Sequence, residues 1–157
     1  MNKNYLNIYN NLIKLTRNKN LYINLEKKDI FSDRLILLFF HLSFFLKSYK
    51  SSTNKNKLQD LFDFIIRQIE ISLREIGYGD VSINKKMKEY INLFYSILDK
   101  IDSWDKFNEN EKKNFIENYL NTKKNLDFYV DYFEKYRLFL INNTLNIFSK
   151  DILNFKI

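Results

Sequence analysis

The chain has no cysteine and no proline, and its 157 residues include only two glycines and one histidine. The lack of cysteine excludes a disulfide framework, a thiolate metal site and a cysteine nucleophile. One histidine, His41, cannot form a histidine-based metal cluster, and two glycines are too few for a phosphate-binding loop. We therefore expect no catalytic residue, no metal, no cofactor and no small-molecule substrate, and we predict that the protein is not an enzyme.

Long apolar runs are also missing. The most apolar stretch, Leu35 to Leu46, has about twelve residues, whereas a membrane span needs roughly 20. We interpret it as a helix that is buried on nearly all sides and capped by Ser32. Hydrophobic residues make up 45% of the chain, which is enough for a substantial core.

No segment shows the alternation typical of a strand, and apolar residues recur instead at spacings of three and four. The sequence therefore predicts an all-α fold, a single compact helical-bundle domain of about six helices over residues 1–157. Beside the helix after Ser32, the expected helices cover residues 2–17, 58–76, 83–101, 108–120 and 125–148. Asn108 and Glu111 have the spacing of a capping box, and Trp104 is expected in the core.

Basic charge is concentrated at one end of the sequence. Residues 1–57 contain eleven Lys and Arg but three Asp and Glu, whereas residues 58–157 contain fifteen and sixteen. A basic N-terminal third favours RNA or an anionic membrane surface. It is equally consistent with a charge that only keeps an aromatic-rich protein soluble.

The two glycines, Gly77 and Gly79, lie two residues apart between two helical patterns. We expect Gly77 to end the first helix in the left-handed conformation, and Gly79 to let the chain turn again. Asp80 or Ser82 would then cap the second helix. The sequence thus predicts a helical hairpin around which the rest of the chain packs.

Charged residues near this turn are the candidate partner-binding residues. Positive charge is unfavourable near a helix N-terminus, so the lysines that follow the turn are interpreted as partner contacts. For the acidic and basic residues beside the turn two alternatives stay open, an internal clamp or a polar edge for a partner. The candidates are Arg74, Glu75, Asp80, Lys85, Lys86 and Lys88.

The polar face of the helix before the turn carries acid-first pairs at i,i+4 spacing, Asp63 with Arg67 and Glu70 with Arg74. A solvated face that pairs with itself is the simpler interpretation.

The residues around the glycines, Leu73 to Ser82 followed by Lys85 to Lys88, closely resemble the signature of the ubiquinol–cytochrome c chaperone family. That signature is approximately Leu-Arg-Glu-Met-Gly-Val-Gly-Asp-Leu-Ser-Val with a downstream Lys/Arg-Met-Lys. Tyr78 and Ile76 depart from it. The resemblance extends from about Tyr5 to Asp102 and is weak in the C-terminal helices.

Other segments carry the same resemblance. Asp33-Arg34 with His41, Gln59 to Asp63, and Thr16 to Tyr22 are similar to further family stretches, and Glu70 stands where the family usually has Asp. The resemblance thus marks, as structural motif positions, Arg34, His41, Gln59, Glu70, Gly77, Gly79 and Met87. From the residues themselves, His41 is expected to be packed inside its helix with one hydrogen-bond partner.

The resemblance implies a non-enzymatic assembly chaperone of the cytochrome bc1 complex, complex III of the respiratory chain. Such a protein would bind nascent cytochrome b and hold it for assembly, with the ribosome, its rRNA and a small companion subunit as further partners. It would contact the inner membrane peripherally. The alternative is a basic helical module that binds RNA, the ribosome or an anionic membrane without a dedicated client.

The first twenty residues are too polar for a secretory signal and contain one arginine. The expected location is therefore the bacterial cytoplasm, and the resemblance implies the periphery of the inner membrane. The alternative is the matrix side of the mitochondrial inner membrane.

Overall fold

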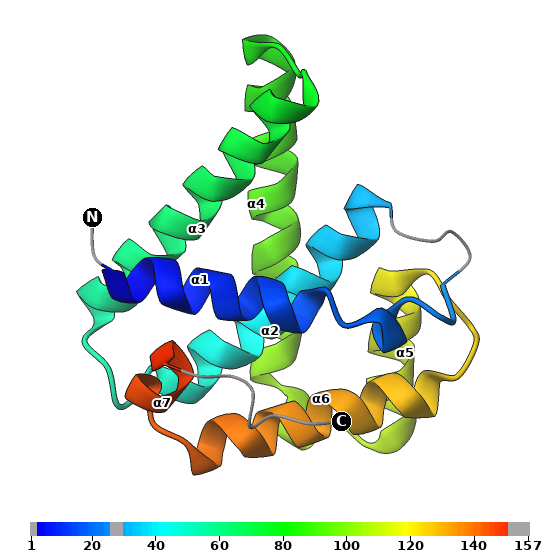
Figure 1. Ribbon diagram of the computed structural model, residues 1–157. Coiled ribbons are helices and arrows are strands. Elements are labelled where there is room, and N and C mark those ends of the chain that lie inside the picture. The colour runs from blue at the N-terminus through cyan, green and yellow to red at the C-terminus, as the bar shows by residue number, and fades with distance from the viewer. Residues whose placement is uncertain (1–2, 26–29, 151–157) are drawn as a thin grey trace.

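The computed structural model describes residues 3–25 and 30–150. Over these residues the chain forms α-helices and two short 3-10 helices, η1 and η2, without a strand, so the predicted all-α class is confirmed (Figure 1). The helices are α1 Lys3–Thr16, η1 Lys19–Leu21, α2 Phe31–Tyr49, α3 Lys55–Ile76, α4 Asp80–Asp102, η2 Trp104–Lys106, α5 Glu109–Leu120, α6 Leu126–Asn142 and α7 Leu145–Lys150.

The helix α2 is the centre of the fold. Its residues from Leu37 to Phe45 are all buried, and it packs against α1, α4, α5 and α6. A helix that is apolar on every face requires neighbours on every side. The prediction of a helix buried on nearly all sides is therefore confirmed, although its N-cap is Ile30, which makes no side-chain capping bond. The prediction that Ser32 caps it was wrong, because Ser32 lies inside the first turn.

Aromatic side chains fill the space between α2 and the C-terminal helices. The rings of Phe44 and Phe133 stack with their centroids 5.6 Å apart, and Phe44 also meets the edge of Trp104 at 5.2 Å. Trp104 is fully buried, as expected. Aromatic pairs at these distances add stability beyond the area that they bury.

The single histidine belongs to this core. His41 Nδ1 donates to the carbonyl oxygen of Leu37 at 2.7 Å, so its Nε2 is left to accept from the hydroxyl of Tyr132 at 2.6 Å. Burial lowers the pKa of His41 from 6.5 to about 4, which keeps the ring neutral. His41 therefore has two close partners, where the sequence predicted one, and its role here is structural.

The helices α3 and α4 form the expected hairpin, but the prediction that the rest of the chain packs around it was wrong. Figure 1 shows the hairpin projecting from the molecule, and the other helices pack around α2 instead. The apolar faces of the two helices meet where the rings of Phe62 and Phe94 pack 5.1 Å apart, and Leu73, Ile83 and Met87 are buried as well. The base of the hairpin joins the body, where α3 packs on α1 and α4 packs on α2. The end with the two glycines therefore lies farthest from the body.

The C-terminal part differs from the prediction. The expected helix over residues 125–148 is interrupted at Asn143 and Thr144, so α6 and α7 are separate and the described residues hold seven α-helices rather than about six. Tyr49 fixes this break, because its hydroxyl donates to the carbonyl oxygens of Leu140 at 3.3 Å and Asn143 at 3.0 Å. Residues 151–157 lie outside the described residues.

The capping box is confirmed, since Asn108 accepts from the Glu111 amide at 2.9 Å and the Glu111 carboxylate accepts from the Asn108 amide. None of the helices that the structure describes has both the length and the apolar character needed to cross a bilayer.

Candidate functional site

The glycine turn is built by Gly77 alone. Gly77 has a φ of 111°, and its amide and that of Tyr78 donate to the carbonyl oxygen of Leu73, both at 3.2 Å. The left-handed helix end that was predicted for Gly77 is confirmed. Gly79, by contrast, has a φ of −79° and a ψ of 164°, an extended conformation that any residue adopts, and nothing lies within 4 Å of the position of a Cβ there. The chain does turn again at Gly79, but this turn does not use the conformational freedom of glycine.

Asp80 does not cap α4. Gly79 is the N-cap without a side-chain bond, and α4 begins at Asp80, three residues earlier than expected. The Asp80 carboxylate instead accepts from Arg74, which also reaches Glu70 at 3.2 Å. The hydrogen bond with Asp80, more than that with Glu70, raises the pKa of Arg74. Arg74 thus forms an internal clamp between the end of α3 and the start of α4.

Glu75 lies away from this clamp. Successive residues of a helix point in different directions, so Glu75 faces α1 and α2 while Arg74 faces Asp80. Glu75 lines a groove there with Tyr9 and Arg34. The candidate trio Arg74, Glu75 and Asp80 therefore does not form one polar edge.

The lysines after the turn have two different environments. Lys85 and Lys88 are exposed, whereas Lys86 is half-buried with its ammonium 5.0 Å from the centre of the Tyr78 ring. Met87 is buried between them on the inner face of the hairpin. Because α4 begins at Asp80, the three lysines lie beyond its first turn, where the helix dipole disfavours positive charge less. Their position therefore supports contact with a partner less strongly than the sequence suggested.

The other motif residues are spread over the molecule. Gln59 is exposed and donates to the Asp63 carboxylate at 3.0 Å, and Glu70 is half-buried beside Arg74. The ion pair between Glu70 and Arg74 is thus present at 3.2 Å, whereas none of the described contacts joins Asp63 to Arg67. That second predicted pair was wrong.

The groove beside Glu75 is the site that sequence reasoning missed. It has a volume of about 500 Å³ and lies between α1, α2 and the end of α3. Its floor is apolar, with the side chains of Ile13, Leu35, Leu38 and Ile69, and Phe31 and Tyr9 line it as well. We call it the arginine groove, because Arg17 and Arg34, both exposed, lie at its edge.

Electrostatics link the charged groups of the arginine groove. Burial raises the pKa of the Tyr9 hydroxyl, Arg17 opposes this rise, and Glu75 adds to it. The groove therefore combines an apolar floor with two basic groups and one acidic group at its edge. Such a surface suits an apolar segment that carries a polar or acidic residue.

Three stretches that carry the family resemblance meet at the arginine groove. They are Thr16-Arg17, Asp33-Arg34 and the residues before Gly77, and they come from three different helices or helix ends. Sequence alone could not find this convergence, because it gives the face of each helix but not the pairing of faces.

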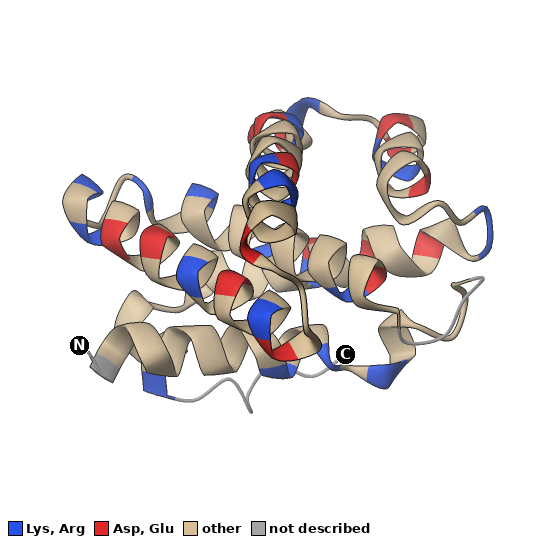
Figure 2. Cartoon of the chain, turned by 90° about the horizontal axis from the view of Figure 1, so that it is seen from above, with Lys and Arg blue, Asp and Glu red and all other residues tan. Residues whose placement is uncertain are grey.

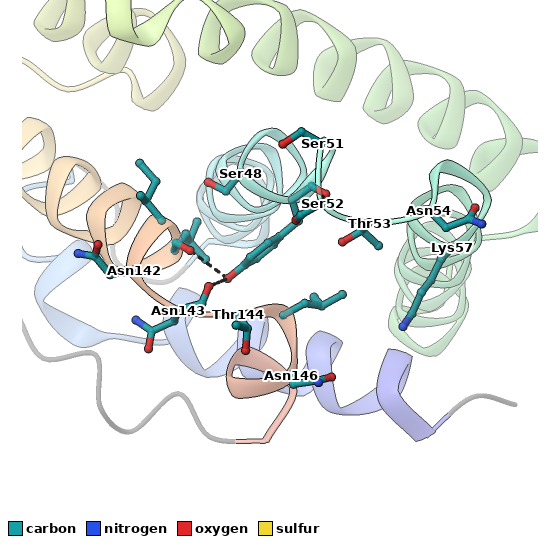
Figure 3. Close-up of a pocket in the computed structure, with 14 residues that line it drawn as sticks. Ser48, Ser51, Ser52, Thr53, Asn54, Lys57, Asn142, Asn143, Thr144 and Asn146 are labelled. Atoms are coloured by element: carbon teal, nitrogen blue, oxygen red, sulfur yellow. Dashed lines mark hydrogen bonds between the residues drawn. The ribbon is translucent and has the colours of Figure 1, made fainter.

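A second hollow, of about 720 Å³, lies between the α2–α3 and α6–α7 connections, as Figure 3 shows. It is lined mainly by serine, threonine and asparagine side chains with Lys57 as its one charged group. Among the residues that the structure describes, no group of His, Asp and Glu side chains is placed to hold a metal ion. The chemistry of this hollow is that of a hydrated loop surface.

Folding places some basic residues of the N-terminal third next to acidic residues from later in the chain. Figure 2 shows basic segments but no acidic ones on α1, whereas α3, α4, α5 and α6 carry residues of both signs. Part of the basic N-terminal third is paired with later residues, since Lys47 lies 3.0 Å from Asp105 and Lys50 lies 3.5 Å from Asp102. Part of the positive charge counted for residues 1–57 is therefore neutralised by acidic residues that come later in the chain.

A family model for the ubiquinol-cytochrome C chaperone matches residues 24–120. The chain belongs to this family. The match covers α2 to α5, including Arg34, the clamp and the hairpin, but it leaves out Thr16, Arg17 and the rest of α1. It extends through α5, beyond the expected limit at Asp102. No curated protein and no solved structure matches the chain.

Family membership supports the chaperone interpretation and, with it, a non-enzymatic role. A chaperone needs a surface for a client. In the described part of the chain, the arginine groove has the apolar floor that this role requires.

Proposed function

We propose that this protein is a non-enzymatic assembly chaperone of the cytochrome bc1 complex that binds newly made cytochrome b and holds it for assembly. The observation that carries the proposal is the family match over residues 24–120, which includes the walls of the arginine groove on α2 and α3. The proposed location is the periphery of the inner membrane, on the bacterial cytoplasmic side or the mitochondrial matrix side. The further proposed partners are the ribosome with its rRNA and a small companion subunit.

The arginine groove is the proposed site for the client. A membrane helix that has not yet been inserted exposes apolar side chains, and these gain free energy when they leave water. Ile13, Leu35 and Leu38 offer an apolar floor, and Arg17 and Arg34 can bind an acidic residue or a free carboxylate next to the apolar side chains. At about 500 Å³ the groove holds a few side chains of a segment rather than a whole helix.

The test is purification of the tagged protein from membranes of its host, followed by measurement of the cytochrome b that comes with it. We expect Arg17→Glu with Arg34→Glu to reduce the recovered cytochrome b about fivefold, as two lost ion pairs would. Lys123→Glu with Lys124→Glu is the matched control, because both lysines are exposed in the connection between α5 and α6. Circular dichroism verifies that both variants are folded.

Two results contradict the proposal. Absence of cytochrome b from the wild-type purification contradicts the function, and equal recovery with the groove variant and the wild type contradicts the site.

The alternative is a basic helical module that binds RNA or an anionic membrane without a client. The strongest argument for it was the basic N-terminal third, and the pairs of Lys47 with Asp105 and Lys50 with Asp102 weaken that argument. A steep loss of binding to arbitrary RNA with rising salt, together with no recovery of cytochrome b, would favour this alternative.

A further inference from the structure

The end of the α3–α4 hairpin exposes apolar side chains that the core does not use. Ile76 is 59% exposed, Tyr78 is 40% exposed and Val81 is 86% exposed. Single exposed apolar residues are common on protein surfaces, but three within six residues at a projecting end form a local patch. We call these three residues the hairpin tip.

Basic residues follow the hairpin tip on the same face of α4. Val81, Lys85 and Lys88 have a spacing of four and three, so they lie in one stripe along the helix, and all three are exposed. With a rise of about 1.5 Å per residue, the two lysines lie about 6 Å and about 10 Å behind Val81. Lys86 lies over the Tyr78 ring and keeps a third positive charge near the tip.

The acidic groups near the hairpin tip are largely engaged elsewhere. Asp80 and Glu70 both pair with Arg74, so these three groups together carry one net negative charge, and Glu75 lines the arginine groove. Glu89 is exposed and remains beside the three lysines. The stripe behind the tip is therefore net positive.

We propose that the hairpin tip inserts shallowly into the surface of an anionic bilayer. Ile76, Tyr78 and Val81 would enter the boundary between headgroups and acyl chains, where apolar and aromatic side chains partition. Lys85 and Lys88 follow at the depth of the lipid phosphates, which attract basic residues close to the membrane. Ile76 also lines the end of the arginine groove, whereas Tyr78, Val81 and the lysines lie outside it. The hairpin tip would thus hold the chaperone on the membrane with the groove for the client next to the bilayer surface.

The experiment is flotation of the full purified chain with vesicles of phosphatidylcholine, alone or mixed with anionic phosphatidylglycerol. We expect binding to the mixed vesicles that Lys85→Gln with Lys88→Gln lowers about tenfold. Tyr78→Ser with Val81→Ser should cause a loss of similar size. Because all four side chains are exposed, these variants should keep the wild-type circular dichroism.

Matched controls remove the same chemistry from other faces. Lys123→Gln with Lys124→Gln removes two exposed positive charges, and Leu138→Ser with Ile141→Ser removes two apolar side chains of α6 that are 48% and 58% exposed. Both controls should bind the mixed vesicles as the wild type does.

A direct readout is the fluorescence of Tyr78→Trp, which should shift to shorter wavelength when the mixed vesicles are added. The parent Trp104 is buried in the core and provides the unchanged reference.

Three outcomes overturn the proposal. They are a wild type that floats with neither vesicle, controls that lose as much binding as the tip variants, and tip variants that change only the self-association of the chain in sedimentation. The last result would assign the tip to a second copy. No cytochrome b is present in this experiment, so its failure would not contradict the proposed chaperone function. Failure to recover cytochrome b would likewise not contradict the insertion of the hairpin tip into a membrane.

Discussion

Arg74 at the end of α3 donates to the carboxylate of Asp80 in the first turn of α4, across the turn that Gly77 makes. The neighbouring Glu75 lies on another face of α3 and lines the arginine groove. The signature around the glycines therefore contains residues with two different structural roles. Arg74 and Asp80 close the hairpin, and Glu75 contributes to the groove that is proposed to bind the client.

Loss of the clamp should leave the fold intact and act on function. Because Arg74 and Asp80 are both exposed, ion pairing between them adds little to stability in water. We expect Arg74→Ala with Asp80→Ala to melt close to the wild-type temperature and to lower the amount of bc1 complex in host membranes. Lys135→Ala with Asp131→Ala, which removes an exposed pair 2.9 Å long on α6, is the control. Unchanged bc1 levels in the folded clamp variant would contradict this role.

The two glycines should respond differently to alanine. Gly77→Ala forces a residue with a Cβ into a φ of 111°, which should lower the free energy of unfolding by about 1 kcal/mol or more. Gly79→Ala meets no neighbour within 4 Å and fits the extended backbone, so its effect should stay within about 0.5 kcal/mol. Denaturant unfolding of both variants measures the difference, and equal losses would show that this account of the turn is wrong.

His41 should make the protein less stable as the pH falls. Its pKa is about 4 in the folded chain and 6.5 ordinarily, so below pH 6.5 the unfolded chain binds a proton that the folded chain does not. The stability present above pH 6.5 is therefore lost as the pH drops through the window from 6.5 to 4. From about pH 7.5 to about pH 5.5 the loss should be about 1 kcal/mol.

The control for this pH effect is His41→Gln, which cannot titrate. Whatever its own stability, the free energy of unfolding of this variant should change less over the same pH range. An equal slope in the variant and the wild type would assign the acid sensitivity to other groups.

Glu134 connects three partners near the core. Its carboxylate accepts from the indole of the buried Trp104 at 2.5 Å, from Lys112 at 2.8 Å and from Arg137 at 3.1 Å. Partial burial raises the pKa of Glu134, but the hydrogen bonds to these three groups outweigh it and lower the pKa overall. Glu134→Leu leaves the indole N–H and Lys112 without this acceptor and should cost about 2 kcal/mol.

Thermal unfolding with Glu134→Gln as the conservative variant measures this contribution. Glutamine keeps an acceptor for the indole N–H, so Glu134→Gln should lower the melting temperature less than Glu134→Leu does. Equal melting temperatures for the two variants would show that the hydrogen bond to Trp104 is unimportant.

Local signals explain what could be predicted from sequence. The left-handed end at Gly77 and the capping box at Asn108 each depend on a few neighbouring residues, and both are present in the structure. The apolar run of α2 also predicted its burial, because no other environment suits a helix without a polar face.

The errors arose where a distant partner outcompeted a local rule. Asp80 has a residue type that favours an N-cap, yet Arg74 binds it from the preceding helix. The break between α6 and α7 contains neither glycine nor proline, and the hydroxyl of Tyr49 from α2 meets it. The arginine groove depends on the packing of α1, α2 and α3, which helical periodicity does not specify.

The central claim is that the arginine groove holds newly made cytochrome b. Phe31 lines the groove and is half-buried, so a photoreactive benzoylphenylalanine can replace it conservatively. The same replacement at Phe128, half-buried on α6 away from the groove, is the control. Under illumination in the host during synthesis, the account predicts a crosslink from position 31 to labelled cytochrome b and little or none from position 128. No crosslink from position 31, or equal crosslinks from both positions, would contradict it.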